Sequence, residues 1–322
     1  MTPSPLITTV ELTSFSVAID ELDTDAAERG VRYQPGARHR HTRFGVRIHT
    51  DAGISGSYVP PRSRAMVAMP ACRFLADLLV GKPALERERH YQAMRRATKH
   101  VGELGIGPLD IALWDLAGKL QDMSIAQMLG GYRWRLPAYA STLGGDRQPD
   151  GLSSPEAYAD FAVQCSELGY RAYKMHGWSA GEAAEEIAML RAVGDRVGAD
   201  MTLMYDAACH LPTLADAIRV GRVCDEYGYA WFEDPYADGG LSATGHRTLR
   251  QRITTPVLIT EHAHNPQTKL ALLEAAATDM LRVDPDYDGG ITGCLKVALA
   301  AEVLGVDAEV HACGPAMRQL MA

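Results

Sequence analysis

The stretch MTLMYDAACHLPTLADAIRVGRVCDEYGYAWFED, residues 201–234, decides the fold of this chain. It begins with a short apolar strand, MTLMYD, continues into an amphipathic helix and returns to a second strand, AWFED. Short apolar strands that alternate with amphipathic helices are typical of a parallel sheet covered by helices. The two strands also carry acids at their C-terminal ends, Asp206 and Glu233, so the unit places candidate functional residues as well.

The same unit recurs on both sides of this stretch. We predict further strands at PAYAS (137–141), RAYKM (171–175), VLITE (257–261), LRVD (281–284) and AEVHA (308–312). Polar residues at the strand ends follow one another at intervals of 32, 27, 28, 23 and 27 residues: Lys174, Asp206, Glu233, Glu261, Asp284 and His311. Units of this length predict a TIM-type (β/α) barrel, whose active site lies at the C-terminal ends of the strands. A doubly wound sheet is the alternative, but neither GxGxxG nor a Walker pattern is present.

Residues 1–131 have a different organisation. ITTVELTSFSVAI and TRFGVRIHT predict strands of a β-meander, joined by a polar connection from Asp20 to His41. Residues 62–129 have a helical pattern that Gly130-Gly131 ends. We therefore predict an α+β domain over residues 1–131 and a barrel domain over residues 132–322. Because seven barrel strands are present rather than eight, we expect the barrel to be truncated before its last strand.

Composition excludes several classes of protein. The 322 residues carry a formal net charge of −8, and the basic residues are scattered, which argues against a nucleic-acid surface. The start of the chain has no signal-peptide pattern, and no apolar run approaches the roughly 18 residues of a membrane span. We therefore expect a cytoplasmic protein without a membrane partner. The six cysteines have neither CxxC nor zinc-type spacing, so they are interpreted as buried thiols rather than disulfides or ligands.

Three acids at the ends of successive strands, Asp206, Glu233 and Glu261, should converge within a few ångströms in a barrel. Such a cluster of negative charge is costly without a cation, and oxygen-only ligands favour Mg²⁺, with Mn²⁺ as a substitute. Each acid taken alone would equally suit a cap or a salt bridge. Three in consecutive units indicate a metal site.

The remaining candidates lie on two sides of the predicted barrel. Lys174 and His176 form a K-x-H pair whose side chains share one face of a strand. Asp284 and His311 end neighbouring strands, where the carboxylate can fix the histidine tautomer and leave the other nitrogen as a base. Both groups have structural alternatives, since Lys174 can simply neutralise the acids and a strand histidine is often structural.

These residues resemble the enolase superfamily, specifically its mandelate racemase subgroup, over nearly the whole chain. ALWDLAGKLQDMSIAQMLGG is similar to the last helix of the family's capping domain, and Asp206, the turn at Glu233 and Glu261 match its metal ligands. Asp284 and His311 match its Asp-His dyad. The related muconate cycloisomerase and dipeptide epimerase group carries a lysine where Asp284 stands.

The resemblance implies that a base takes the proton next to a metal-bound carboxylate, that Mg²⁺ stabilises the enediolate, and that an acid completes the reaction. We expect dehydration of an acid sugar to a 2-keto-3-deoxy acid by a hydro-lyase. A racemase or epimerase of a 2-hydroxy acid is the nearest alternative, and a barrel that binds without catalysis is the other.

Three departures from the family pattern bear on that expectation. His176 replaces a frequent second lysine, so it can act as base, acid or hydrogen-bond donor. Ala208 stands where relatives often have Asn or His, which weakens a galactonate-dehydratase-like assignment. The eighth strand, which usually supplies an electrophilic carboxylate, is not in the sequence.

Substrate selection is expected in the capping domain. There the Asp20–His41 stretch would cover the barrel mouth, with Tyr33 and Arg38 as contacts, and Trp178 would line the pocket. Tyr33 and Arg38 are equally plausible as solvated loop residues, and Trp178 as a helix cap. The resemblance also makes a homo-oligomer the expected assembly.

Overall fold

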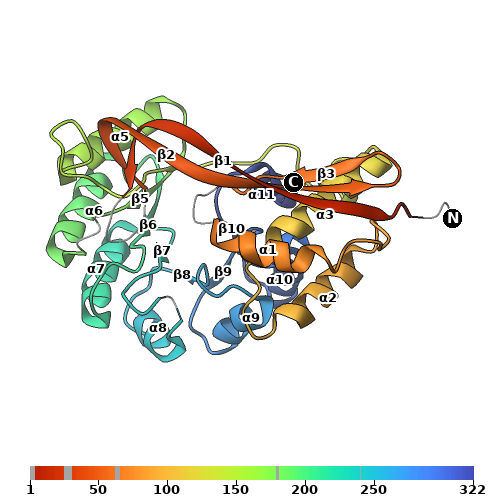
Figure 1. The fold of residues 1–322 in the computed structure, drawn as a ribbon. Coiled ribbons are helices and arrows are strands. Elements are labelled where there is room, and N and C mark those ends of the chain that lie inside the picture. Colours follow the sequence, from red (N-terminus) through yellow and green to blue (C-terminus); the bar gives the residue numbers. More distant parts are fainter. Residues whose placement is uncertain (1–3, 25–30, 62–65, 179–180, 240) are drawn as a thin grey trace.

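The computed structural model describes residues 4–24, 31–61, 66–178, 181–239 and 241–322. Figure 1 shows an N-terminal part, coloured red to yellow, beside a larger part, coloured green to blue. In the larger part helices surround a parallel sheet.

The N-terminal part is an antiparallel sheet with the order β1-β2-β3 in the described residues, packed against helices. Its elements are β1 Ile7–Thr24, β2 Val31–Thr50, β3 Ser55–Tyr58, α1 Ala68–Ala76, α2 Arg87–Thr98, α3 Ile106–Gln121 and α4 Ile125–Met128. The predicted β-meander is confirmed. The predicted connection from Asp20 to His41 is wrong, because β1 and β2 continue through most of it as a long ribbon (Figure 1). The described residues of this ribbon are mostly exposed on both faces, so no apolar alternation marked them as strands.

The core of the N-terminal part centres on α3. Its sequence is apolar on almost every side, and most of its residues are buried. β3 packs directly on it through Gly56, where a Cβ atom would lie 2.1 Å from the carbonyl oxygen of Ala112. Glycine is therefore required for this close approach of strand and helix.

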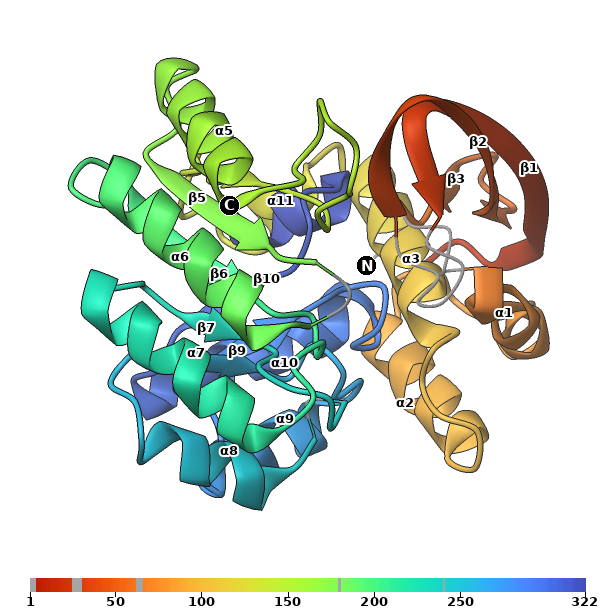
Figure 2. The ribbon, with the colours of Figure 1, turned by 90° about the vertical axis from the view of Figure 1, so that its left-hand side faces the viewer.

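The larger part is a curled parallel sheet with the strand order β10-β9-β8-β7-β6-β5-β4 across the described chain. Its elements are β4 Ala140–Ser141, α5 Pro155–Glu167, β5 Ala172–His176, α6 Ala183–Val197, β6 Thr202–Asp206, α7 Leu214–Tyr227, β7 Phe232–Glu233, α8 Ala243–Arg250, β8 Val257–Ile259, α9 Pro266–Glu274, β9 Met280–Val283, α10 Gly290–Leu304, β10 Ala308–Val310 and α11 Pro315–Met321. Figure 2 shows α5, α6, α7 and α8 following one another along the outside. Each strand predicted for the barrel is present.

Local sequence explains where several barrel helices begin. Ser154, Thr213 and Asn265 are N-caps whose side-chain oxygens each accept a hydrogen bond from the backbone N–H three residues later. Pro155 and Pro266 occupy the first helical turn, where their missing N–H has no cost. These caps fix where the outer helices begin after the loops that follow the strands.

The two parts meet where α3 packs on α10. Thr292 donates to Asp110 from its backbone N–H at 3.0 Å and from its hydroxyl at 2.6 Å, and it accepts from Trp114 Nε1 at 2.9 Å. Tyr58 donates to Asp286 Oδ1 at 2.8 Å nearby. Buried, satisfied hydrogen bonds therefore fix one part on the other.

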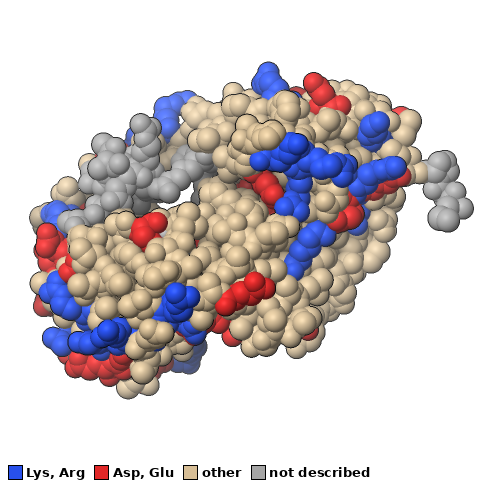
Figure 3. All heavy atoms as spheres, turned by 90° about the horizontal axis from the view of Figure 1, so that it is seen from below, with Lys and Arg blue, Asp and Glu red and all other residues tan. Residues whose placement is uncertain are grey.

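The outer surface carries charges of both signs. On the face in Figure 3, basic and acidic side chains lie close to one another. Surface ion pairs elsewhere include Arg196 with Asp160 at 2.7 Å. Within the described chain, no helix is long and apolar enough to cross a membrane.

Candidate functional site

Seven predicted site residues share one position, at or just past the C-terminal end of a parallel strand. Lys174 and His176 lie on β5, Asp206 and Glu233 end β6 and β7, and Glu261, Asp284 and His311 follow β8, β9 and β10. Because all these strands are parallel, the seven side chains lie at the same end of the sheet.

Lys174 joins the carboxylates of β6 and β7. Its ammonium donates to Asp206 Oδ2 at 2.9 Å and to Glu233 Oε2 at 2.8 Å, and all three side chains are at most 5% exposed. Asp206 and Glu233 are also register partners, so strand pairing holds them side by side. Burial alone would lower the pKa of Lys174, but the two carboxylates outweigh it and raise that pKa. The amine is therefore a fixed cation at neutral pH.

A second buried cation, Arg282 of β9, also binds Glu233. Its Nε donates to Glu233 Oε1 at 2.8 Å, its Nη2 contacts Oε2, and Trp231 Nε1 donates to Oε2 at 3.2 Å. Burial favours a raised pKa of Glu233, yet Arg282 and then Lys174 lower it. Sequence reasoning missed Arg282, although an arginine inside an apolar strand and two residues before Asp284 was a signal.

His176 has both ring nitrogens in contact with acceptors. Nδ1 lies 2.7 Å from the carbonyl oxygen of Thr142, and Nε2 lies 2.9 Å from Asp206 Oδ2. Both nitrogens therefore carry hydrogen, because a carbonyl and an ionised carboxylate only accept. Burial would lower the pKa of His176, but Asp206 outweighs it and raises that pKa. This imidazolium can donate a proton.

Asp284 and His311 are in direct contact. His311 Nδ1 lies 2.9 Å from Asp284 Oδ2, which fixes Nδ1 as a protonated nitrogen. The other nitrogen, Nε2, lies 3.4 Å from Glu261 Oε2. Asp284 is 1% exposed and His311 18% exposed, so the carboxylate is buried behind an imidazole that solvent reaches.

The three acids predicted to hold a metal lie at one end of the sheet without reaching a common point. Asp206 and Glu233 are bridged by Lys174, whereas Glu261 lies beside the histidine that follows β10. Their ligand atoms do not all come within 4.8 Å of one another in the described structure. Their donor chemistry fits Mg²⁺, because all three offer carboxylate oxygens.

Another group of side chains at this end does reach that spacing. Cys209, Asp234 and His262 each offer one ligand atom, and these atoms all lie within 4.8 Å of one another in the described residues. Hydrogen bonds to Asp234 and Cys209 raise the pKa of His262 to about 11. Sequence reasoning missed this group because its members lie far apart in the chain and have no metal-binding spacing.

Left-handed backbone conformations gather just past the strand ends. The non-glycine residues there include Ala208 with φ 47°, Asp234 with φ 40°, Thr260 with φ 93° and Ala312 with φ 66°. Such conformations cost roughly 1–3 kcal/mol each and occur where surrounding contacts hold them, often at functional sites. For Thr260, the backbone N–H of Arg282 donates to its hydroxyl at 2.8 Å.

The predicted substrate contacts lie on β2 of the cap and just past the end of β5. Trp178 is 3% exposed, and its Nε1 donates to the carbonyl oxygens of Asp146 at 3.1 Å and Leu152 at 2.9 Å. Trp178 is therefore buried in the core, and a role for it in lining the pocket stays a prediction. Arg38 lies on β2, 71% exposed and 3.4 Å from Asp20. The side chain of Tyr33 is outside the described residues.

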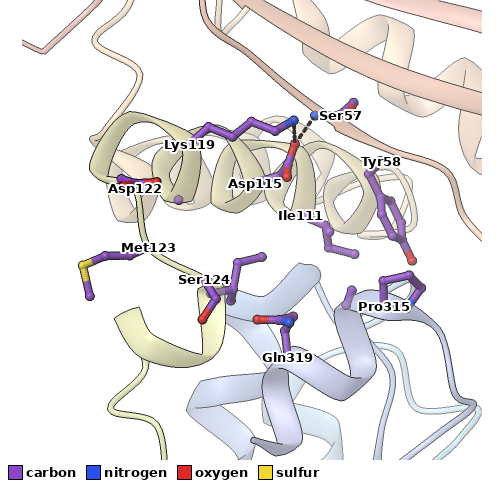
Figure 4. A pocket seen from close by; sticks show the side chains of 13 residues that line it. Ser57, Tyr58, Ile111, Asp115, Lys119, Asp122, Met123, Ser124, Pro315 and Gln319 are labelled. Carbon is purple, nitrogen blue, oxygen red and sulfur yellow. Dashed lines mark hydrogen bonds and ion pairs between the residues drawn. The ribbon is translucent and has the colours of Figure 1, made fainter.

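A separate pocket of about 470 Å³ lies between β3, α3, α4 and α11. Figure 4 shows Asp115 of α3 pairing with Lys119 and with the backbone of Ser57 at its rim. The predicted site residues do not line it. It is therefore distinct from the strand ends that carry the charged cluster.

A curled parallel sheet with helices outside, an antiparallel cap, and acids and bases at the strand ends define the class of capped TIM-type barrels. The chain belongs to the mandelate racemase/muconate lactonizing enzyme family of the enolase superfamily. The family's N-terminal domain matches residues 23–130, and the domain described as enolase C-terminal domain-like matches residues 157–322.

Relatives are similar over most of this chain. D-galactarolactone cycloisomerase of Agrobacterium fabrum is 29% identical over 303 residues, which are 91% of this chain and 75% of that protein. L-rhamnonate dehydratase of Saccharopolyspora erythraea is 28% identical over 81% of this chain and 63% of its own length. The crystal structure of D-glucarate dehydratase from Agrobacterium tumefaciens, complexed with magnesium, has a TM-score of 0.87 at 27% identity and covers 99% of this chain and 84% of that one.

Proposed function

We propose that this chain is a magnesium-dependent hydro-lyase that removes the proton next to the carboxylate of an acid sugar and expels the neighbouring hydroxyl. Asp206, Glu233 and Glu261 would hold the Mg²⁺. The relatives named above, two dehydratases and a cycloisomerase of sugar acids or their lactones, support this substrate class. The observation that carries the proposal is the Asp284–His311 contact beside Glu261.

The proposed roles follow from the contacts of each side chain. His311 takes the α-proton at Nε2, while Asp284 keeps Nδ1 protonated and stabilises the imidazolium that forms. Lys174 supplies fixed positive charge at the strand end. When bound, Mg²⁺ would polarise the substrate carboxylate and offset the charge that develops there.

The contacts of His176 make it the candidate acid of the proposed dehydration. Both nitrogens of His176 carry hydrogen in their contacts with Thr142 and Asp206, so this side chain can donate a proton. The same donor would serve a racemase by protonating the opposite face of the substrate, so the choice of dehydration rests on the dehydratases among the relatives. We therefore assign His176 as the acid: the β-carbon–oxygen bond breaks, and a proton from Nε2 leaves with the hydroxyl as water. The enol that remains tautomerises to the 2-keto-3-deoxy acid.

A screen of acid sugars with the full-length protein in D₂O and Mg²⁺ tests this function. We expect one substrate to give a 2-keto acid, and the His311→Asn variant to lose about 10²–10⁴-fold in rate. The control is His49→Asn on β2, whose ring pairs with Glu11 in the cap and should leave the rate unchanged.

Two outcomes would contradict the proposal. Deuterium uptake at the α-carbon with inversion and no keto acid would identify a racemase or epimerase. No exchange across a broad library, with metal and ligand binding equal in the parent and in His311→Asn, would identify a barrel that binds without catalysis.

A further inference from the structure

A compact group of three different donors lies beside the carboxylates assigned above. Cys209 offers a thiol, His262 an imidazole and Asp234 a carboxylate, with all three ligand atoms within 4.8 Å of one another. His262 Nε2 lies 3.1 Å from Asp234 Oδ2. The side chain of His262 is 38% exposed and Cys209 is partly exposed, so a solvated ion can reach the group.

The backbone holds two of the three donors in place. Cys209 has φ 61° and Asp234 has φ 40°, both left-handed conformations that non-glycine residues rarely adopt. The backbone N–H of Cys209 donates to the carbonyl oxygen of Asp234 at 2.8 Å. The turns after β6 and β7 are thus tied together, and this tie places the thiol beside the carboxylate.

Asp234 has an oxygen that the described structure leaves unsatisfied. Its side chain is 2% exposed, and no described group forms a hydrogen bond with Oδ1. A buried carboxylate oxygen without a donor is costly, and a bound cation is one way in which proteins satisfy it. This observation is independent of the spacing of the three donors.

We propose that Cys209, Asp234 and His262 form a second metal site, which takes zinc or another borderline divalent cation. A thiolate and an imidazole select such ions, whereas Mg²⁺ prefers oxygen donors alone. Thiolate and carboxylate together balance the charge of a divalent ion. Three protein ligands leave one tetrahedral position for water or another small ligand, as in open zinc sites.

The second site adjoins the first along the chain but differs from it in chemistry. Asp234 follows Glu233, His262 follows Glu261 and Cys209 lies three residues after Asp206, so the ends of β6, β7 and β8 contribute to both groups. Zinc at the second site would therefore lie at the same end of the sheet as the oxygen-only group that Mg²⁺ would occupy. The two sites can be distinguished by the sulfur ligand.

Cobalt(II) titration of the metal-stripped, reduced full-length protein in excess Mg²⁺ tests the site. A thiolate ligand gives a near-ultraviolet sulfur-to-cobalt absorption band that oxygen ligands cannot give. We expect this band at one equivalent, and we expect Zn²⁺ to displace the cobalt. In a chelator competition, Cys209→Ser and His262→Gln should each weaken Zn²⁺ binding more than about 100-fold. Mutating a residue that only hydrogen-bonds to a metal ligand already costs about 10–100-fold in metal affinity, and loss of a ligand should cost more.

Matched variants make the outcome decisive. Cys313→Ser removes an exposed thiol elsewhere and should keep the band. Asp206→Asn removes a donor of the magnesium group and should keep it too. The proposal is overturned if no band forms in the parent, if Cys209→Ser keeps it, or if Cys313→Ser abolishes it. Circular dichroism and thermal melting establish whether each variant is folded. If Cys209→Ser does not fold, the loss of Zn²⁺ affinity in His262→Gln tests the proposed site instead.

Discussion

Glu233 lies between two buried cations, Lys174 and Arg282. This position determines how much the loss of either cation would destabilise the fold. Arg282 binds it through two nitrogens, and Lys174 donates to it at 2.8 Å. Arg282 is fully buried. A buried pair stabilises little in total, but removing one member leaves a charge that the interior cannot solvate.

We predict that Arg282→Met lowers the free energy of unfolding by about 3–5 kcal/mol, because Glu233 then keeps only Lys174 as a cationic partner. Urea denaturation measures the loss. The matched control is Arg196→Met, which breaks an exposed pair with Asp160 and should cost at most about 1 kcal/mol. Equal losses in the two variants would contradict the prediction, because the buried cation would then stabilise the fold no more than the exposed one.

Single residues were predictable where the strand pattern alone positions them. Asp206 and Glu233 follow directly from two apolar strands, since parallel strands bring their ends together. Arg282 could have been suspected from its place in an apolar strand, but its partner Glu233 and the Cys209 group were not predictable, because these contacts join different strands and depend on side-chain packing. The hydrogen bonds of Trp178 were not predictable for the same reason, since only the folded chain brings two carbonyl oxygens to its N–H.

At the scale of elements, the pattern of apolar residues determined which strands could be predicted. The central barrel strands, β5 to β9, are mostly buried and apolar, so they stand out from the amphipathic helices around them. The β1–β2 ribbon is exposed on both faces in its outer half, so its polar sequence was indistinguishable from a connection. A strand can therefore be recognised from its sequence when it is buried, because burial requires apolar residues. Pairing with another strand alone leaves no such pattern.

The contact between β3 and α3 leads to a prediction about an element. Gly56→Ala would place a Cβ atom 2.1 Å from the carbonyl oxygen of Ala112 and 2.5 Å from Leu116 Cβ. Because both neighbours belong to a buried helix, the strand must move, and we expect a loss of about 1–3 kcal/mol in urea denaturation.

Gly45→Ala in β2 is the control for that prediction. Its new Cβ would lie 3.5 Å from Val59 Cγ2, an ordinary contact, and its backbone is not left-handed. We expect its stability to stay within about 0.5 kcal/mol of the parent. An equally neutral Gly56→Ala would contradict the close packing of β3 on α3.

At the scale of the whole molecule, the cap and the barrel are joined through a buried acid. Asp110 of α3 is fully buried and accepts two hydrogen bonds from Thr292 of α10. Burial raises its pKa from 3.8 to about 7, against the opposing effect of the Thr292 hydrogen bonds. The joint between the two parts therefore contains a group that titrates near neutral pH.

Asp110→Asn should make the stability of the folded chain less dependent on pH. Between about pH 4 and about pH 7 the folded parent holds a proton on Asp110 that the unfolded chain releases, so its stability falls as pH rises through this window. Asparagine cannot titrate and can still pair with Thr292. The free energy of unfolding of the variant minus that of the parent should therefore increase across this window and stay level outside it.

Urea denaturation at a series of pH values measures this difference, which other titrating groups do not affect because both proteins share them. A constant difference would mean that Asp110 ionises in the folded protein as it does in the unfolded chain. Protonation of Asp110 would then make no contribution to the stability of the contact between the two parts.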